Sequence, residues 1–218
     1  MNTPRHALVL LAAGASRRLG QPKQLLRIGG ETLLHRAARF GLATAPAQAI
    51  LVLGAQADMI APAADGLAVQ RVHCPDWEEG LGASLRAGLA AVSTPCEGAL
   101  VLLCDQPALG AAHLETLVAA WRRDPTRATA SAYAGVLGVP ALLPRAWFDV
   151  LSHVTGDRGA RDLLRERTDQ VTAVPAPSLS EDIDHPGDLS LRFAESRLGT
   201  EKSRSSLGTL TSRREVDR

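Results

Sequence analysis

The sequence predicts an α/β protein of three layers, in which a mostly parallel sheet lies between two layers of helices. Two features of the chain predict this class. Short apolar runs bounded by turn residues alternate with helix-like segments. Strands separated by helices at this spacing indicate βαβ units, with helices on both faces of the sheet. The 218 residues, 45% of them hydrophobic, can bury a sizeable core in one domain or at most two small ones.

The predicted elements follow from these patterns in chain order. Segment 7–13 is apolar on both faces, as expected of a strand buried inside a parallel sheet. Segment 31–42 has Leu33, Leu34 and Ala37 on one helical face. The predicted strands are 7–13, 49–53, 68–72, 99–104, 128–133, 136–143 and 171–174. The predicted helices are 31–42, a weaker 56–62, 81–92, 111–122, 145–151 and one that starts near Asp157.

Charge and composition exclude several classes of function. The 24 basic and 23 acidic residues leave a net charge of +1, so no overall field attracts nucleic acid or an anionic membrane. The seven aromatic residues are too few and too scattered for a surface that stacks single-stranded nucleic acid. No apolar run reaches the ~20 residues of a membrane span, and no signal peptide is recognisable. These features predict a cytoplasmic protein that binds small molecules.

The composition of the chain changes near Ser196. Few large apolar residues follow this position. The sequence therefore predicts a folded domain of residues 1–195 and a disordered C-terminal tail of residues 196–218. Cys74, Cys96 and Cys104 are odd in number and lack C-x-x-C spacing, which favours buried free thiols.

A glycine-containing loop follows the first predicted strand and ends at a lysine. It reads Ala12-Ala13-Gly14-Ala15-Ser16-Arg17-Arg18-Leu19-Gly20-Gln21-Pro22-Lys23. The glycine permits a tight turn that exposes N–H groups, and Ser16, Arg17 and Lys23 add donors and positive charge, as a polyphosphate requires. Lys23 is one of only two lysines beside 22 arginines, and a compact ammonium suits a crowded phosphate site. An ordinary strand-to-helix loop remains the alternative, because the Walker A and G-x-G-x-x-G patterns are absent.

Three aspartates are candidate metal ligands. Asp105 leaves the apolar strand 99–104 at the carboxyl edge of the sheet, where the loop around Gly14 also lies. A carboxylate beside a phosphate loop suggests Mg²⁺, which binds one or two carboxylates together with phosphate oxygens and water. Asp182 and Asp184 face the same way if their segment is extended, so that one could complete the site and the other support it. The alternatives are a helix cap at Asp105 and a turn around Asp182 and Asp184.

Four motifs in consistent order make the chain similar to a known family. Over residues 5–192 it resembles the nucleotidyltransferases related to molybdenum cofactor cytidylyltransferase, and its opening Leu-Ala-Ala-Gly resembles the cytidylyl branch. The resemblance implies a Rossmann-like, three-layer α/β/α fold of the nucleotide-diphospho-sugar transferase type. The motifs are Leu11-Ala12-Ala13-Gly14-Ala15-Ser16-Arg17-Arg18-Leu19-Gly20 with Lys23-Gln24-Leu25-Leu26, Trp77-Glu78-Glu79-Gly80-Leu81-Gly82-Ala83-Ser84-Leu85, Cys104-Asp105-Gln106-Pro107, and Asp182-Ile183-Asp184.

The resemblance also implies roles for individual residues. Its catalytic set is Lys23, Arg17 and Asp105. The implied metal ligands for Mg²⁺ are Asp105 and Asp184, with Asp182 behind or beside them. The implied nucleotide-binding residues are Ala12, Ala13, Gly14, Ser16, Arg17, Lys23 and Ser84, the last of them at the base or ribose. Arg158 and Arg161, in the stretch Gly156-Asp157-Arg158-Gly159-Ala160-Arg161, are implied contacts to the acceptor phosphate.

The chain departs from the family pattern at two positions. Cys74 stands where an Asn often precedes Pro-Asp-Trp. Gly138-Val139-Pro140 stands where Gly-His-Pro is typical, in the region expected to meet the acceptor.

Together these observations predict an Mg²⁺-dependent nucleotidyltransferase. In the reaction implied, the phosphate of a molybdopterin-type cofactor accepts CMP from CTP, or a nucleotide from another NTP, and pyrophosphate leaves. The alternatives are the same transfer to another phosphorylated acceptor, such as a sugar phosphate, and a non-catalytic molybdenum-cofactor carrier. The resemblance further implies transient contact with a molybdoenzyme or its chaperone. No nucleic-acid or membrane partner is expected.

Overall fold

A computed structural model describes residues 3–180 of the chain, apart from the side chain of Arg158. The predicted domain boundary at residue 195 and the predicted tail of residues 196–218 lie outside the described residues.

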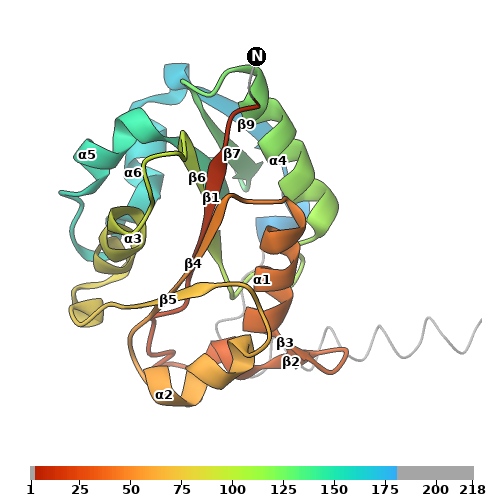
Figure 1. Cartoon of the computed structure of the whole chain (residues 1–218), viewed down its shortest axis with the longest axis vertical. Helices are drawn as coiled ribbons and strands as arrows, with labels where there is room; N and C mark the ends of the chain where they lie inside the picture. Colours follow the sequence, from red (N-terminus) through yellow and green to blue (C-terminus); the bar gives the residue numbers. More distant parts are fainter. Residues whose placement is uncertain (1–2, 181–218) are drawn as a thin grey trace, which may run out of the picture. The chain divides into compact units, whose positions relative to one another are not determined.

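A seven-stranded sheet runs through the middle of the described chain (Figure 1). Its strand order is β5-β4-β1-β6-β8-β7-β9. Strand β8 is antiparallel to both of its neighbours, β6 and β7, whereas the other neighbouring pairs are parallel. The mostly parallel sheet predicted from the sequence is confirmed. The strands are β1 His6–Leu11, β4 Gln48–Leu53, β5 Gln70–His73, β6 Gly98–Leu103, β7 Ala128–Tyr133, β8 Val136–Pro144 and β9 Val171–Pro175.

Helices cover both faces of this sheet. Figure 1 shows α3, α5 and α6 on one face and α1 and α4 on the other. None of the helices in residues 3–180 combines the length and the apolar character needed to cross a membrane. The α-helices are α1 Leu33–Ala43, α2 Ala57–Ile60, α3 Leu81–Ala90, α4 Ala111–Arg123, α5 Phe148–Leu151 and α6 Gly159–Glu166. The 3₁₀ helices are η1 Lys23–Leu25, η2 Ala61–Ala64, η3 Trp77–Glu79, η4 Arg145–Trp147, η5 Gly156–Arg158, η6 Thr168–Gln170 and η7 Pro177–Ser180.

The alternation of side chains along β1 divides the core into two layers. Leu8 and Leu10 lie in the layer under α1 and α4. Val9 and Leu11 lie in the layer under α3, α5 and α6. All four side chains are buried, and burial of each contributes about 1.5–3 kcal/mol. An apolar run on both faces is therefore what a central strand needs.

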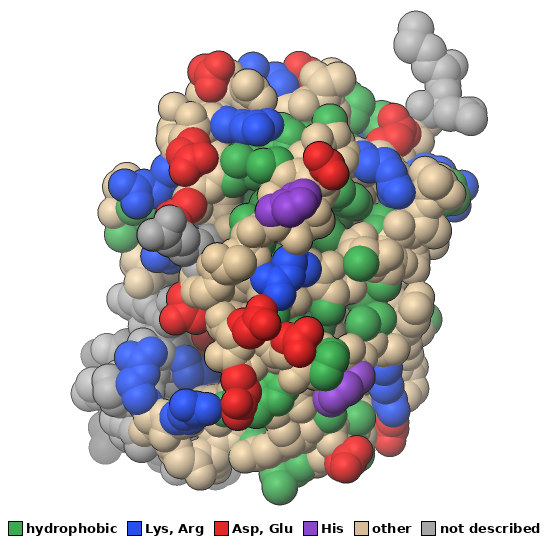
Figure 2. Space-filling model, turned by 90° about the vertical axis from the view of Figure 1, so that its left-hand side faces the viewer, with side chains coloured by type: hydrophobic (Ala, Val, Ile, Leu, Met, Phe, Trp, Pro, Cys, Tyr) green, Lys and Arg blue, Asp and Glu red, His purple; other side chains and the backbone are tan. Residues whose placement is uncertain are grey.

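One glycine in α3 brings that helix close to the sheet. A Cβ at Gly88 would lie 2.5 Å from Cγ1 of Val9, so only glycine fits without a shift of the core. Close contact between α3 and β1 fixes where the first turn of α3 lies relative to the strand ends. Charged side chains of both signs are interspersed over the outer face of this helical layer (Figure 2).

A short hairpin before α1 differs from the prediction. Residues Arg27–Ile28 form β2 and Glu31–Thr32 form β3, which pair antiparallel. Gly29 and Gly30 both have positive φ, of 58° and 87°, which is the conformation that a two-residue hairpin turn requires. The helix predicted over 31–42 therefore begins at Leu33, and Thr32 caps it by accepting a hydrogen bond from the His35 N–H.

The three cysteines are free and buried, as predicted.

Candidate functional site

The predicted loop and the predicted aspartate meet at one edge of the sheet. Strands β1 and β6 are parallel neighbours, with Leu11 opposite Leu103, so the segments that follow them leave the sheet together. The Lys23 ammonium nitrogen lies 3.6 Å from Oδ2 of Asp105. Both side chains are mostly buried, with exposed fractions of 15% for Lys23 and 26% for Asp105. The structure therefore brings together two of the three residues in the predicted catalytic set.

Hydrogen bonds within the loop fix its path from β1 to Lys23. The Lys23 N–H donates to Oγ of Ser16 over 3.0 Å. Ser16 has a positive φ of 52°, which is uncommon for a residue with a side chain and marks the sharp bend of the loop. Gly14 is exposed, and a Cβ built on it would meet no atom within 4 Å. The loop thus presents open backbone at Gly14 while its far end is tied to Ser16.

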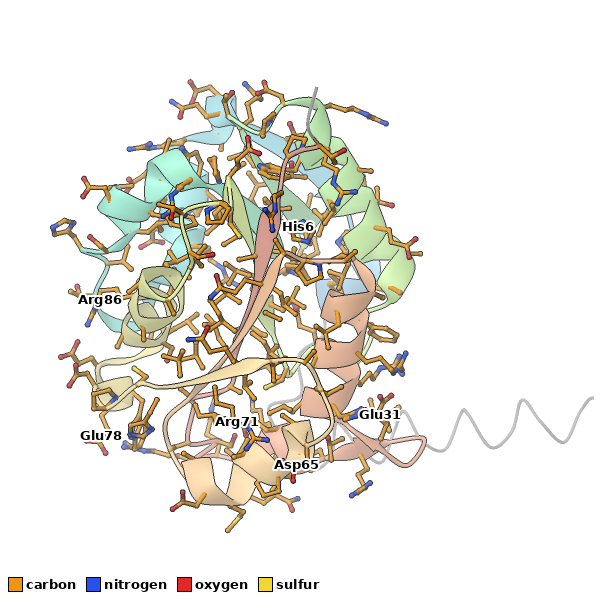
Figure 3. All side chains as sticks on the ribbon, in the orientation of Figure 1. His6, Glu31, Asp65, Arg71, Glu78 and Arg86 are labelled. Carbon is orange, nitrogen blue, oxygen red and sulfur yellow. The ribbon has the colours of Figure 1, made fainter. Side chains whose placement is uncertain are left out.

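Arg17 lies on the solvent side of the loop. Its guanidinium is 3.7 Å from a carboxylate oxygen of Glu78 in η3, and the two side chains are 77% and 70% exposed. Figure 3 shows Glu78 at the margin of the view, in the segment between β5 and α3. An ion pair of this exposure stabilises little, by about 0–1 kcal/mol, so Arg17 is held only loosely in its present position.

Ser84 is buried inside α3, with 4% of its surface exposed. Cys74 is also buried, and burial raises the pKa of its thiol. Cys74 occupies the position where the family pattern often has an Asn. The predicted contact of Ser84 with the base or ribose stays a prediction.

The segment that carries the predicted acceptor arginines, Arg158 and Arg161, packs against α3. Arg86 of α3, labelled in Figure 3, donates to the backbone carbonyl of Val154 and to Glu79. A Cβ at Gly82 would lie 3.0 Å from the carbonyl oxygen of Gly156, which shows how closely the two backbones approach. Arg161 is exposed on α6, and only the backbone of Arg158 is described.

Of the three predicted metal ligands, Asp105 is the one that lies within the described residues. Asp182 and Asp184 lie outside the described residues. Within residues 3–180, no group of three or more His, Cys, Asp or Glu side chains could hold a metal ion. Asp105, mostly buried beside Lys23, fits the kind of Mg²⁺ site in which a nucleotide supplies most of the oxygens.

Cys104 stands next to Asp105 and is not a nucleophile. Burial, and then the charge of Asp105, raise the pKa of its thiol. The thiol also donates to the carbonyl oxygen of Leu11 over 3.8 Å. A neutral, buried thiol does not attack a substrate, because the thiolate is the reactive form.

Two glutamines next to the predicted charged residues were assigned no role from the sequence. Gln24 donates to two carbonyls of the loop, those of Ala12 and Gly14. Gln106 donates to the carbonyl of Val139, which also accepts a hydrogen bond from the Tyr133 hydroxyl. Both glutamines are buried. Each glutamine directly follows a predicted charged residue, Lys23 or Asp105, inside one of the motifs. This position in the sequence could have identified both glutamines.

Comparison with known proteins relates this chain to a family. Residues 8–171 match the family described as the MobA-like NTP transferase domain. Nicotine blue oxidoreductase of Paenarthrobacter nicotinovorans is 37% identical over 188 residues, which cover 81% of this chain and 90% of the relative. Purine catabolism protein PucB of Bacillus subtilis is 32% identical over 173 residues, which cover 76% of this chain and 83% of that protein.

Solved structures show the same fold. Rv0371c of Mycobacterium tuberculosis superposes with a TM-score of 0.74 at 31% identity, over 88% of this chain and 99% of that one. The same protein has been solved in complex with manganese, with a TM-score of 0.70 at 28% identity, over 88% of this chain and 99% of that one. The 4-diphosphocytidyl-2C-methyl-D-erythritol synthase of Anaerococcus prevotii shares the fold alone, with a TM-score of 0.71 at 14% identity, over 89% of this chain and 97% of that one.

The predicted three-layer fold and the predicted resemblance are both confirmed. A match over most of the described residues, together with relatives above 30% identity that cover most of the chain, places the protein among nucleotidyltransferases. This chain belongs to the MobA-like NTP transferase domain family.

Proposed function

We propose that this protein is an Mg²⁺-dependent cytidylyltransferase that transfers CMP from CTP to the phosphate of a molybdopterin-type cofactor. The observation that carries the proposal is the contact of 3.6 Å between Lys23 and Asp105, beside a backbone loop that follows the central strand. A cation, a carboxylate and open backbone N–H groups at one sheet edge suit a triphosphate with its metal ion.

In the proposed reaction, an oxygen of the acceptor phosphate attacks the α-phosphorus of CTP. The new phosphorus–oxygen bond forms as the bond to the β-phosphate breaks, and pyrophosphate leaves. Such a transfer needs positioning and charge neutralisation rather than a protein nucleophile. Lys23 neutralises charge on the phosphates, and the backbone from Ala12 to Gly14, with Ser16, holds them in place.

Arg17 and Ser84 complete the proposed nucleotide site. Arg17 is exposed and loosely paired with Glu78, so it can turn toward the phosphates when they arrive. Ser84 is assigned to the base or ribose by the resemblance, and the buried position of its hydroxyl means that a contact would require a small shift of α3 or Cys74. Leu11-Ala12-Ala13-Gly14 is the motif that favours CTP over GTP.

A divalent metal ion belongs to this proposal. Asp105 would hold it together with Asp184, and Asp182 would lie behind or beside them. When bound, Mg²⁺ neutralises the triphosphate and polarises the phosphorus that is attacked. The manganese complex of Rv0371c supports a role for a divalent ion.

The acceptor is the least constrained part of the proposal. Arg158 and Arg161 lie on the segment that packs against α3, and their positive charges suit a phosphate. Val139, where the family typically has His, gives this chain an apolar residue in the region expected to meet the acceptor. A sugar phosphate is therefore the second acceptor class, and a carrier that binds the cofactor without catalysis is the third possibility. A cytoplasmic location and transient contact with a molybdoenzyme or its chaperone remain part of the same proposal.

One comparison favours a second function. The relative with 37% identity is named an oxidoreductase, so a redox reaction could use the same loop to bind the phosphates of a dinucleotide. The two functions differ in their products: a nucleotidyltransferase releases pyrophosphate, whereas a reductase consumes a reduced dinucleotide.

The deciding experiment incubates the full chain with Mg²⁺, each of the four NTPs and a phosphorylated acceptor, either a molybdopterin-type cofactor or a sugar phosphate. We expect pyrophosphate to be released with CTP and the cofactor, at a higher rate than with GTP. Equal or faster release with GTP would contradict the preference for CTP. Release with the sugar phosphate alone would move the acceptor to the second class. Cofactor binding without release would make the protein a carrier. A parallel incubation with nicotine blue and NADH or NADPH tests the redox function by loss of the absorbance of the reduced dinucleotide.

A further inference from the structure

Gln24 is a buried polar side chain directly beside Lys23. It lies in η1, and 3% of its surface is exposed. Its Nε2 donates to the carbonyl oxygen of Ala12 over 2.9 Å and to that of Gly14 over 2.9 Å. Both acceptors belong to the loop that follows β1. One side chain therefore fixes two alternate peptide groups of that loop.

These two hydrogen bonds determine which backbone groups of the loop are left for a ligand. A trans peptide is planar, so its carbonyl and the N–H that follows point in opposite directions. The carbonyls of Ala12 and Gly14 point toward Gln24, and the N–H groups of Ala13 and Ala15 consequently point away from it. An anion is bound by N–H groups and repelled by carbonyl oxygens. Gln24 thus turns the unfavourable groups away from the open side of the loop.

A second tie joins the same short segment to the loop. The Lys23 N–H donates to Oγ of Ser16 over 3.0 Å. The main chain of Lys23 and the side chain of Gln24 are consecutive in sequence, so both ties act at one place. The loop N–H groups and the Lys23 ammonium are in this way held in a fixed relation to each other, and to Asp105 at 3.6 Å.

The hydrogen bonding of Gln24 is poorly suited to stability alone. Its Oε1 has no hydrogen-bond partner within the described part of the chain and is buried. A buried amide with one unsatisfied oxygen stabilises a fold less than an apolar side chain of the same shape. The residue at this position is therefore better explained by what it does to the loop than by its contribution to the core.

We propose that Gln24 is the positioning residue of the nucleotide site: it holds the loop with its N–H groups toward the triphosphate and its carbonyls away. This inference rests on the proposed function, because it assumes that the loop binds an NTP. Both hydrogen bonds of Gln24 go to the loop, so in this proposal it acts through the loop backbone and not by contact with the ligand.

The test compares CTP binding by the full chain and its Gln24→Met variant, with Mg²⁺, by isothermal titration calorimetry. Methionine keeps the length of the side chain and removes both donors. We expect the Kd for CTP to rise at least tenfold, while the melting temperature changes by only a few degrees. The matched control is Gln48→Met. Gln48 also donates through Nε2, to the carbonyl of Ala91 over 2.9 Å and to Gln70 over 3.0 Å, but it begins β4 at the opposite edge of the sheet. The Kd of Gln48→Met for CTP should equal that of the wild type.

A second variant gives a readout that a merely structural residue would not affect. In Gln24→Glu, the ionised carboxylate has no donor, whereas the protonated carboxyl has one. We expect its CTP affinity, relative to the wild type at the same pH, to improve as the pH falls. If Gln24→Met does not fold, the comparison of Gln24→Glu with the wild type across pH tests the inference in its place.

Two results would overturn the inference, and they differ from failure of the proposed function. Unchanged CTP affinity in Gln24→Met, or an equal loss of affinity in Gln48→Met, would show that Gln24 does not position the loop. In either case the chain would still bind a nucleotide. A wild-type chain that binds none of the four NTPs would overturn both the proposed function and the inference built on it.

Discussion

Lys23 and Asp105 neutralise each other across the site, with 3.6 Å between the ammonium nitrogen and Oδ2. Lys23 comes from the loop after β1, and Asp105 follows β6, so their contact depends on the pairing of these two strands. In the proposed complex, the triphosphate would pair with the Lys23 ammonium and its metal ion with the Asp105 carboxylate, so each charge would keep a partner of the opposite sign.

Replacement of Lys23 tests the cation. Lys23→Ala should lower kcat/KM by two orders of magnitude or more, because loss of one contact to developing charge commonly costs about 2.7–4 kcal/mol. Lys23→Arg should also be poor, since a planar fork does not replace a compact ammonium. Steady-state rates of pyrophosphate release measure both effects. Near-normal rates for Lys23→Arg would make the lysine an ordinary surface cation. Arg71→Ala, which removes the cation of the exposed pair with Asp65, serves as the control and should keep full activity.

Replacement of Asp105 tests the metal assignment. Asp105→Asn keeps the shape and one oxygen but removes the charge, so transfer should fall at least a hundredfold and recover only in part with excess Mg²⁺ or Mn²⁺. The variant should still fold, and the free energy of unfolding should fall by no more than about 3 kcal/mol, because the pair is mostly buried and Lys23 loses a charged partner. Thermal melts and initial rates across a metal titration measure the two quantities. An unfolded variant whose surviving fraction turns over normally would show that Asp105 is structural. Asp65→Asn, in the surface pair with Arg71, is the control.

Replacement of Gly14 should affect nucleotide binding and leave the stability of the fold unchanged. A methyl group there meets no atom within 4 Å, and Gly14 is not among the residues with positive φ, so Gly14→Ala should leave the melting temperature nearly unchanged. If the loop backbone approaches the phosphates closely, the methyl group should weaken CTP binding at least tenfold. Calorimetric titration with CTP measures this loss. Wild-type affinity in Gly14→Ala would mean that the ligand does not approach the loop at this residue.

His6 predicts how stability depends on pH. Burial, and then the charge of Arg122, lower its pKa from 6.5 to about 4. Its Nε2 shares a hydrogen bond with the Thr44 hydroxyl over 3.0 Å. The unfolded chain binds a proton at this side chain near pH 6.5 and the folded chain does not, so His6 should cost the fold about 3 kcal/mol as the pH falls from 6.5 to 4.

Urea unfolding at neutral pH and at about pH 4 measures this dependence. His6→Gln should reduce the loss of stability in acid, because the amide does not titrate. His73→Gln, at an exposed position on β5, should leave the loss as it is in the wild type. Equal acid sensitivity in wild type and His6→Gln would show that other groups control it.

The strands could be predicted because a central strand of this fold is apolar on both faces. Residues 49–53 and 99–104 flank β1, and each was recognised from its composition alone. The direction of β8 could not be predicted, since an apolar run has the same composition whichever way it runs. The turn before it contains Ala134 and Gly135, both with positive φ, and alanine there conceals a hairpin that Asn-Gly would have indicated.

The site was predictable where it depends on strand ends and less so where it depends on side-chain contacts. Lys23 and Asp105 follow two strands of the sheet, and the common edge of parallel strands brings them together. The roles of Gln24 and Gln106 depend on which carbonyl each side chain reaches, and spacing along the chain does not specify this.

The position of β1 in the sheet has a consequence for synthesis on the ribosome. β1 is made first, β4 pairs with one edge of it, and β6, which pairs with the other edge, ends at Leu103. About 50 residues separate the ends of β4 and β6, so at 5–20 residues per second one edge of an apolar strand waits roughly 3–10 s for its partner. During that interval the nascent chain displays an unpaired strand edge, which is the feature that chaperones bind and that promotes aggregation. Ribosome-bound chains that end before β6 should therefore be protease-sensitive at β1, and chains long enough to expose β6 should be protected.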